Sequence, residues 1–249
     1  MQLYDRYYEA IIGLIGEIQR AERETIAQVA RICADAMQNR GVIHLYDTGH
    51  LVNRELVNRV GGMASFAPLT FDFGVQNPNR YRDENKEPPI IPPTTTDTQL
   101  VSVVISRSNF RPGDVLIVGT VSGKTAVPIE LAIQAKQLGL TVISVTAVKY
   151  SSQLKSDHPS GKRLFEVTDR VIDNHADYGD AMLEVEGLDR KIIPASGVGA
   201  VVALWGLVAA ITDEMLQRGL APTFFMSINL PDGPAIYQAT MADYIKKGY

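Results

Sequence analysis

The sequence is poor in the residues that mark several classes of protein. Its 249 residues contain one cysteine, Cys33, and four histidines. A single cysteine forms no internal disulfide and fits a reducing compartment. The net charge is −4 and no dense run of Lys and Arg is present, which argues against nucleic-acid binding. No Cys/His cluster has a metal-ligand spacing, so we expect neither a metal nor another cofactor.

Long apolar runs are also missing. The longest apolar stretch, residues 198–211, is short and interrupted by glycine, so we expect no membrane-spanning helix. The first residues include acids and tyrosines, where a signal peptide has basic residues followed by an apolar core. We therefore expect a cytoplasmic protein without membrane contacts. An apolar content of 45% and a charged content of 21% are ordinary for a globular protein with a sizeable core.

Short apolar strands alternate with helical patterns along the chain. This order predicts an α/β fold, in which helices cover both faces of a mostly parallel, five-stranded sheet. The expected strands are residues 42–46, 64–73, 115–118, 141–146 and 170–173. The expected helices are residues 3–38 (one helix or a broken pair), the segment after the turn 47–50 to about residue 60, and 98–106, 126–138 and 197–217. We expect one domain over residues 1–249, with a helical N-terminal segment (1–40), a long loop (74–100) and a C-terminal extension (219–249).

The most informative segment joins the third expected strand to the following helix. The buried strand 115–118 breaks into a small, hydroxyl-rich loop, residues 119–125, before a helical pattern begins at residue 126. The first turn of a helix has unpaired N–H groups and the positive end of the dipole, so this loop predicts an anion site, with phosphate as the guest. An ordinary strand-to-helix turn, with Ser122 as N-cap and Thr125 in the first turn, is a second, compatible interpretation.

The loop ends like a Walker A motif, with Gly123-Lys124-Thr125. That motif also needs a glycine five positions before its second glycine. Val118 stands there, and Gly119 comes one residue too late. The sequence therefore does not favour nucleotide hydrolysis. A second turn, residues 47–50, also follows a strand, and ligands of parallel sheets bind beyond the carboxyl ends of the strands.

Two segments together resemble the SIS (sugar isomerase) domain family. Residues 45–62 look like the family's first strand, glycine-containing turn and helix, and residues 113–146 look like its hydroxyl loop, helix and next strand. The resemblance covers roughly residues 30–215. It implies a flavodoxin-like three-layer sandwich that binds a phosphorylated sugar, in homodimers or homotetramers with sites near the subunit interface. Residues 174–181 and 225–229 are most similar to a branch related to the phosphoheptose isomerases.

The resemblance also implies a set of binding residues. Side chains and backbone amides of the hydroxyl loop would bind the sugar phosphate, and the turn after the first strand would contact the sugar. The residues concerned are Thr48, Gly49, Thr120, Ser122, Gly123, Lys124 and Thr125. Lys124 stands where the family usually has a neutral residue, and its ammonium either points inward and strengthens anion binding or lies in solvent.

Aldose–ketose isomerisation needs a base and a second proton-transfer group. By resemblance Glu55 is the base, and a solvated ion pair with Arg59 is the alternative interpretation. The family's second group, a histidine on the last helix, is missing from residues 197–217. His50 and His175 are the replacements that we expect, although His50 could cap a helix and His175 could be an ordinary loop residue. The family's metal-binding histidine is Leu51 here, so we expect no zinc.

These residues predict a phosphosugar isomerase. A non-catalytic phosphosugar-binding or regulatory protein is the alternative, because the terminal histidine is absent. A phosphosugar lyase that cleaves an ether by β-elimination, with Glu55 as acid and base, is a third possibility. Of the remaining histidines, we expect His44 to be a satisfied core residue and His158 to lie in a surface loop.

Overall fold

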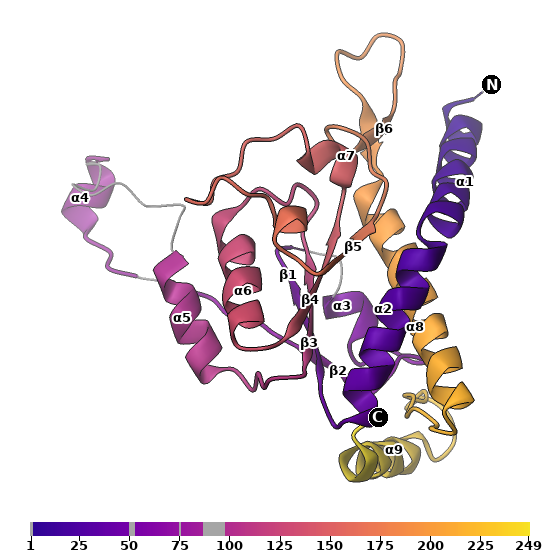
Figure 1. Ribbon diagram of the computed structural model, residues 1–249. Coiled ribbons are helices and arrows are strands. Elements are labelled where there is room, and N and C mark those ends of the chain that lie inside the picture. The colour runs from indigo at the N-terminus through magenta and orange to yellow at the C-terminus, as the bar shows by residue number, and fades with distance from the viewer. Residues whose placement is uncertain (1, 50–52, 75, 87–97) are drawn as a thin grey trace.

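The computed structural model describes residues 2–49, 53–74, 76–86 and 98–249. Five strands form one sheet in the order β2-β1-β3-β4-β5, and all neighbouring strands run parallel (Figure 1). This confirms the predicted α/β class and the five-stranded parallel sheet. The strands are β1 (Ile43–Asp47), β2 (Phe66–Pro68), β3 (Val115–Gly119), β4 (Thr141–Thr146) and β5 (Arg170–Asp173).

Helices cover both faces of this sheet (Figure 1). One face carries α1 (Leu3–Ala21), α2 (Arg23–Gln38) and α8 (Ser196–Gln217), and the other carries α5 (Thr98–Arg107) and α6 (Ala126–Gln137). The remaining elements join or flank these layers, and all but α9 are short. They are α3 (Asn53–Leu56), α4 (Arg80–Glu84), α7 (Val148–Ser151), the 3₁₀ turn η1 (Leu164–Glu166), the hairpin strands β6 (Ala181–Leu183) and β7 (Ile192–Pro194), and α9 (Gly233–Lys247).

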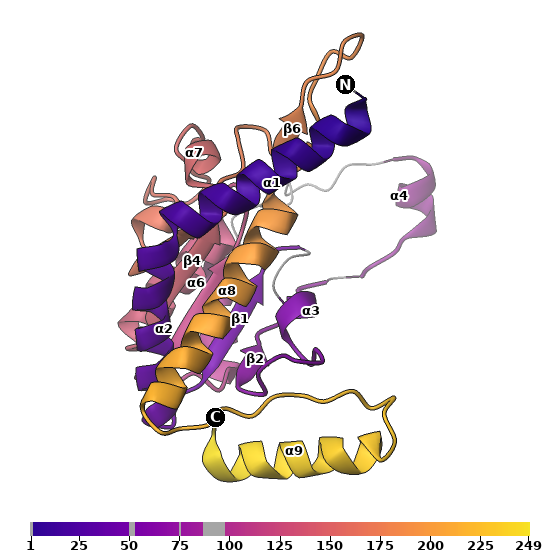
Figure 2. The same cartoon turned by 90° about the vertical axis from the view of Figure 1, so that its right-hand side faces the viewer.

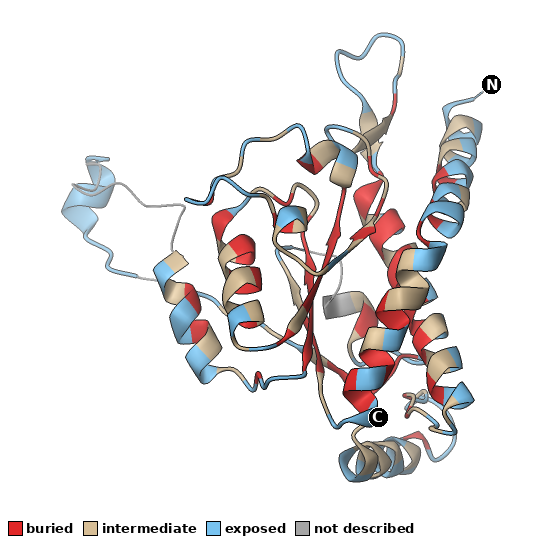
Figure 3. Ribbon diagram, in the orientation of Figure 1, coloured by how far each residue is buried: buried red, intermediate tan, exposed pale blue. Residues whose placement is uncertain are grey.

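The central strand β3 shows why its sequence is continuously apolar. Val115 and Ile117 belong to the core between the sheet and α2 and α8, whereas Leu116 and Val118 belong to the core on the α5 and α6 side. A strand that is covered on both faces needs apolar side chains at every position. Figure 3 shows this continuous burial along the middle of the sheet.

The N-terminal segment is a pair of helices that meet at Glu22. The inner face of α1 buries Ile11, Leu14 and Ile18, and α2 packs along α8. Figure 2 shows that α1 extends beyond the edge of the sheet, towards the hairpin of β6. Burial raises the pKa of the Cys33 thiol on α2 to about 12, so this side chain acts as a small apolar core residue.

Some predicted boundaries were wrong. The helix after the first turn ends at Leu56 rather than near Val60, and the second strand spans only Phe66–Pro68. Long-range pairing accounts for the later start of the strand: the amide of Ala64 donates to the carbonyl of Thr223, next to the hydrogen bonds that Gly61 and Gly62 form with Phe225. Ala64 therefore pairs with a distant segment and not with β1.

The C-terminal extension contains a helix that the sequence analysis did not predict. In α9 only Gly233 is buried. The buried apolar stripe that identifies a helix in a sequence is therefore absent. The expected long loop, residues 74–100, likewise contains a short helix, α4, whose residues are not buried.

Two histidines were assigned from their local sequence alone. His44 is buried with Nε2 at 3.0 Å from Oδ2 of Asp114, which confirms it as a core residue. Burial lowers the pKa of His44, and the hydrogen bond and charge of Asp114 oppose this shift. The expectation that His158 is a surface residue was wrong. It is buried, and its ring nitrogens lie 2.7 Å from Oε2 of Glu130 on α6 and 2.7 Å from Oγ of Ser160.

The helix expected over residues 197–217 is present as α8 and begins one residue earlier. At 22 residues, α8 is the one helix in the described part of the chain that could cross a membrane by its length and composition. Its buried face, which includes Ala203, Leu207 and Ile211, lies in the core shared with α2. Core helices have the same length and composition, so this feature alone decides nothing about membranes.

Candidate functional site

An open cleft of about 690 Å³ lies at the carboxyl edge of the sheet. Its walls come from the end of β1, the loop after β3, the start of α6, α7 and the loop before β6. The lining residues are Tyr46, Thr48, Thr120, Val121, Ser122, Thr125, Ala126, Val127, Pro128, Tyr150 and Asp180.

The cleft lies above the neighbouring strands β1 and β3. Asp47 at the end of β1 pairs with Gly119 at the end of β3. The strand order reverses at this point, and such a switch point opens a crevice between the two loops. The amide of Thr48 donates to the carbonyl of Gly119 at 3.2 Å, which ties the two turns together. The structure therefore brings the predicted residues Thr48, Thr120, Ser122 and Thr125 into one cavity.

The loop after β3 carries unused hydrogen-bond donors. Within the described chain, the amides of residues 122–125 donate no hydrogen bond, and neither do the hydroxyls of Thr48, Ser122 and Thr125. The first amides of α6 add further free donors, as at the start of any helix. Thr125 is the N-cap of α6, so the assignment of Ser122 as N-cap was wrong. Donors of this kind at a helix N-terminus suit an anion.

The boundary moves to Thr125 because of Gly123. This glycine has a φ of 58°, in the left-handed region that other residues rarely adopt. A Cβ at this position would lie 2.8 Å from Oγ of Ser151 and 3.1 Å from Oγ1 of Thr146. Helical backbone therefore starts only at Ala126, and the preceding amides stay free.

Lys124 does not line the cleft. Its ammonium lies 2.9 Å from Asp157, and both side chains are more than a third exposed. This matches the interpretation in which Lys124 lies in solvent. An exposed ion pair of this kind contributes at most about 1 kcal/mol.

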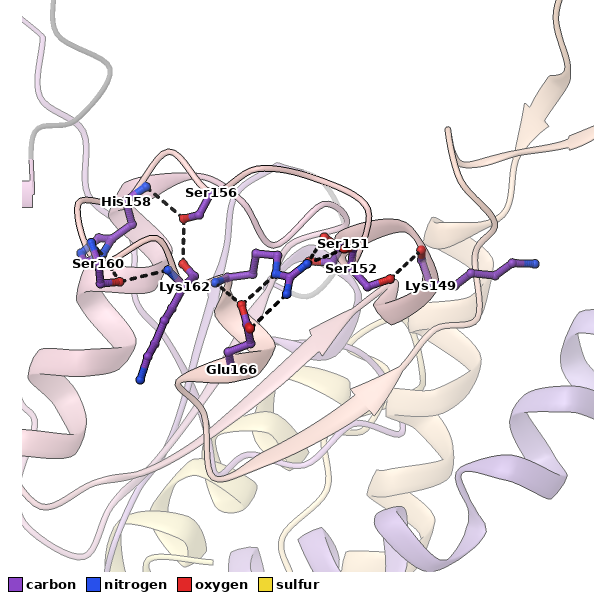
Figure 4. A network of polar contacts seen from close by, with 9 residues as sticks. Lys149, Ser151, Ser152, Ser156, His158, Ser160, Lys162 and Glu166 are labelled. Atoms are coloured by element: carbon purple, nitrogen blue, oxygen red, sulfur yellow. Dashed lines mark hydrogen bonds and ion pairs between the residues drawn. The ribbon is translucent and has the colours of Figure 1, made fainter.

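The segment between α7 and η1 supports the loop from behind. The amide of Leu164 donates to the carbonyl of Gly123 at 2.8 Å, and the amide of Asp157 donates to the carbonyl of Lys124 at 2.9 Å. Figure 4 shows the side-chain contacts that hold this segment, among them those of Ser156, His158 and Ser160. The carbonyls of the loop are thus satisfied on one side, while its amides stay available on the other.

The predicted proton-transfer residues are not gathered in this cleft. Glu55 bonds Arg59 at 2.9 Å, the alternative considered for it, and is not a lining residue. His175 lines a second cavity of about 380 Å³, where its ring nitrogens lie 3.0 Å from Glu22 and 3.3 Å from Glu17. His50 lies outside the described residues.

Two glycines that were predicted as contacts, Gly49 and Gly123, are not lining residues of the cleft. The amide of Gly49 donates to Oδ1 of Asp47 at 2.5 Å. Among the described residues, no three His, Cys, Asp or Glu side chains gather as ligands for a metal ion.

Seven lining residues were not among the predicted contacts. Four of them belong to the predicted loop and the start of the helix after it (Val121, Ala126, Val127 and Pro128), and three come from other segments (Tyr46, Tyr150 and Asp180). Tyr46 ends the apolar part of β1 directly before the predicted turn, so its position could have indicated a lining residue. Its ring stacks on Phe71 at 5.0 Å. Tyr150 comes from α7, which follows β4, and Asp180 comes from the loop after β5. Only the parallel sheet brings these segments to the same edge.

The sequence model of the SIS domain matches residues 6–147. The chain belongs to the SIS domain family. It is 31% identical to a UPF0309 protein of Shouchella clausii over 97% of this chain and 96% of that protein. It is 32% identical to a UPF0309 protein of Caldanaerobacter subterraneus over 98% of each chain.

Among solved structures, a phosphoheptose isomerase from Francisella tularensis has the same fold. The TM-score is 0.51 at 17% identity, over 85% of this chain and 98% of that one. The family resemblance in the sequence is thus confirmed, and the likeness to the isomerase concerns the fold.

The variant Gly123→Ala tests whether the backbone conformation and packing of Gly123 stabilise the loop after β3 in this SIS domain. The left-handed backbone costs alanine about 1–2 kcal/mol, and the contact with Ser151 adds overpacking, so we expect a loss of roughly 2–5 kcal/mol in the free energy of unfolding. Gly161→Ala is the matched control, since Gly161 has a φ of 71° but open space around its Cβ. Urea unfolding of both variants measures the difference, and equal losses would contradict the packing argument.

Proposed function

We propose that this SIS domain binds a phosphorylated sugar in the cleft above β1 and β3. The observation that carries this proposal is the row of free amides at residues 122–125, next to the hydroxyls of Ser122 and Thr125. A phosphate ester accepts several hydrogen bonds at once, and a helix N-terminus favours its negative charge. The backbone of Gly123 and Lys124 takes part through its amides, while the Lys124 side chain pairs with Asp157.

The rest of the cleft suits a sugar. Its volume of about 690 Å³ lies within the range of roughly 300–1,000 Å³ that is usual for small-molecule sites. Thr48 and Thr120 supply hydroxyls for hydrogen bonds, and the rings of Tyr46 and Tyr150 supply apolar surface for the C–H groups of a sugar ring. The relationship in fold to a phosphoheptose isomerase supports the same ligand class.

Ser122→Ala tests phosphate binding. A hydrogen bond to a charged group contributes about 1.5–3 kcal/mol, so we expect the dissociation constant of a sugar phosphate to rise roughly 10-fold or more. In the unaltered protein, a ligand at a hundredfold its dissociation constant should add about 2.7 kcal/mol of stability. A thermal-shift screen of hexose, heptose and amino-sugar phosphates measures both effects.

Ser106→Ala is the matched control, because Ser106 lies on α5 away from the cleft and its hydroxyl donates to the carbonyl of Val103. This variant should bind like the unaltered protein. If no phosphorylated compound raises the melting temperature of the unaltered protein, the proposed ligand class is wrong.

For the chemistry, we propose aldose–ketose isomerisation with Glu55 as the base. In that reaction the carboxylate would have to leave Arg59 to reach the sugar. Glu55→Gln should then lower kcat about 10²–10⁴-fold and leave sugar phosphate binding nearly unchanged. An NMR assay of aldose and ketose phosphates measures turnover. Equal turnover by the unaltered protein and the variant would remove Glu55 from the mechanism.

One observation favours a binding protein without catalysis. Asp180 is the only ionisable acid or base other than tyrosine among the described residues that line the cleft, and both Glu55 and His175 have partners elsewhere. Ligand-induced stabilisation without turnover of any aldose or ketose phosphate would establish this alternative. Release of lactate from a lactyl-ether sugar phosphate would instead establish the lyase reaction.

Assembly into homodimers or homotetramers stays a prediction. It is supported by an exposed stripe on α1, where Tyr4, Tyr8 and Ile12 follow one another at four-residue spacing and are 66%, 45% and 65% exposed. Because residues four apart share one helix face, this stripe is available to a second copy of the chain. We expect light scattering to give an oligomer that Ile12→Glu weakens. A monomer at every concentration of the unaltered protein would contradict the prediction.

A further inference from the structure

The cleft contains one formal charge among its described lining residues, the carboxylate of Asp180. This side chain also caps α8. Its Oδ1 accepts hydrogen bonds from the amides of Ala195 and Ser196, at 3.2 and 2.7 Å, and its Oδ2 accepts one from the Ser196 hydroxyl at 2.8 Å. A carboxylate oxygen has two acceptor positions, so Oδ2 keeps capacity for another donor.

No cation balances this charge. Within the described chain, no Lys, Arg or His forms an ion pair with Asp180, and its three hydrogen-bond donors are neutral. The nearby cations are engaged elsewhere: Lys124 pairs with Asp157 and Lys149 pairs with Asp177. Asp180 thus presents to the cleft a negative charge that no cationic side chain of the described residues pairs with, and the other described lining residues are neutral.

The two ends of the cleft differ in the charge that they favour. The free amides at residues 122–125 follow β3, whereas Asp180 belongs to the loop that follows β5. The strands β3 and β5 flank β4 and therefore lie on the order of 10 Å apart. One end suits an anion and the other suits a cation, at a separation comparable to the length of a sugar ring.

We propose that the ligand of this cleft is an amino-sugar phosphate, with its ammonium group on Asp180 and its phosphate on residues 122–125. The inference rests on the proposed function and narrows its substrate class. A neutral hydroxyl would also donate to Oδ2, and the carboxylate charge strengthens that hydrogen bond, but an ammonium adds the Coulomb attraction between opposite charges.

The test compares glucosamine 6-phosphate with glucose 6-phosphate, which are of nearly equal size, and with N-acetylglucosamine 6-phosphate, which is larger by an acetyl group. In each the phosphate lies across the ring from carbon 2, and the carbon-2 group is an ammonium, a hydroxyl or a neutral amide. Calorimetric titration should show the amine binding about fivefold or more tighter than the other two ligands. Equal affinities would overturn the proposal.

Asp180→Asn removes the charge but keeps an oxygen that can accept from the amides of Ala195 and Ser196, so the cap of α8 is preserved. We expect the variant to lose the preference for the amine and still bind glucose 6-phosphate. Asp189→Asn is the matched control, since Asp189 carries the same charge, pairs with the neighbouring Arg190 and does not line the cleft. It should keep the preference, and a preference that survives Asp180→Asn would overturn the proposal.

The pH dependence of the affinity tests the proposal without a variant. Raising the pH until the ligand amine is neutral should bring the affinity for glucosamine 6-phosphate close to that for glucose 6-phosphate, whose phosphate titrates alike. A constant ratio of the two affinities would overturn the proposal even if Asp180→Asn failed to fold. If none of the three ligands binds to the unaltered protein, phosphosugar binding itself is rejected. If all three bind with equal affinity, only the preference for an amino sugar is rejected.

Discussion

The left-handed backbone of Gly123 is the constraint on which the candidate site depends. It turns the chain after β3 so that α6 begins at Ala126, and it leaves the four preceding amides without partners. The carbonyls of Gly123 and Lys124 point the other way and accept amides from Leu164 and Asp157. The loop therefore has one satisfied side and one donor side. Without the glycine, the two sides would not separate.

The parallel sheet gives this loop its surroundings. Because β1 and β3 are neighbours with their ends in register, the turn after β1 meets the loop after β3. The continuous core on both faces of β3 holds that register, since a shift by one residue would exchange the side chains of the two cores. The packing that stabilises the core therefore also fixes the position of the candidate site.

The features that could be predicted from the sequence are those that depend on residues close together in the chain. The buried run 115–118 read as a strand because both of its faces are covered, and the hydroxyl loop was recognisable from its residues alone. What could not be predicted depends on distant contacts. His158 is buried through Glu130, and the start of α6 is set by how Gly123 packs against Ser151. The sequence analysis did not predict α9 in the C-terminal extension. A helix that buries only Gly233 has no buried apolar face, and such a face is what produces a helical pattern of apolar residues in a sequence.

Asp180 lies in the segment 174–181, which the sequence analysis singled out for its family resemblance, but its place in the cleft depends on the fold. Its carboxylate caps α8, so the core helix and the cleft share one side chain. The N-terminal amides of α8 and the positive end of its dipole lie against this negative charge, which is the favourable arrangement. The fold itself therefore stabilises a charge in the cleft that no lysine, arginine or histidine of the described chain neutralises. With neutral donors at the other end, the pattern of charge, more than the size of the cavity, decides which sugar phosphate the cleft prefers.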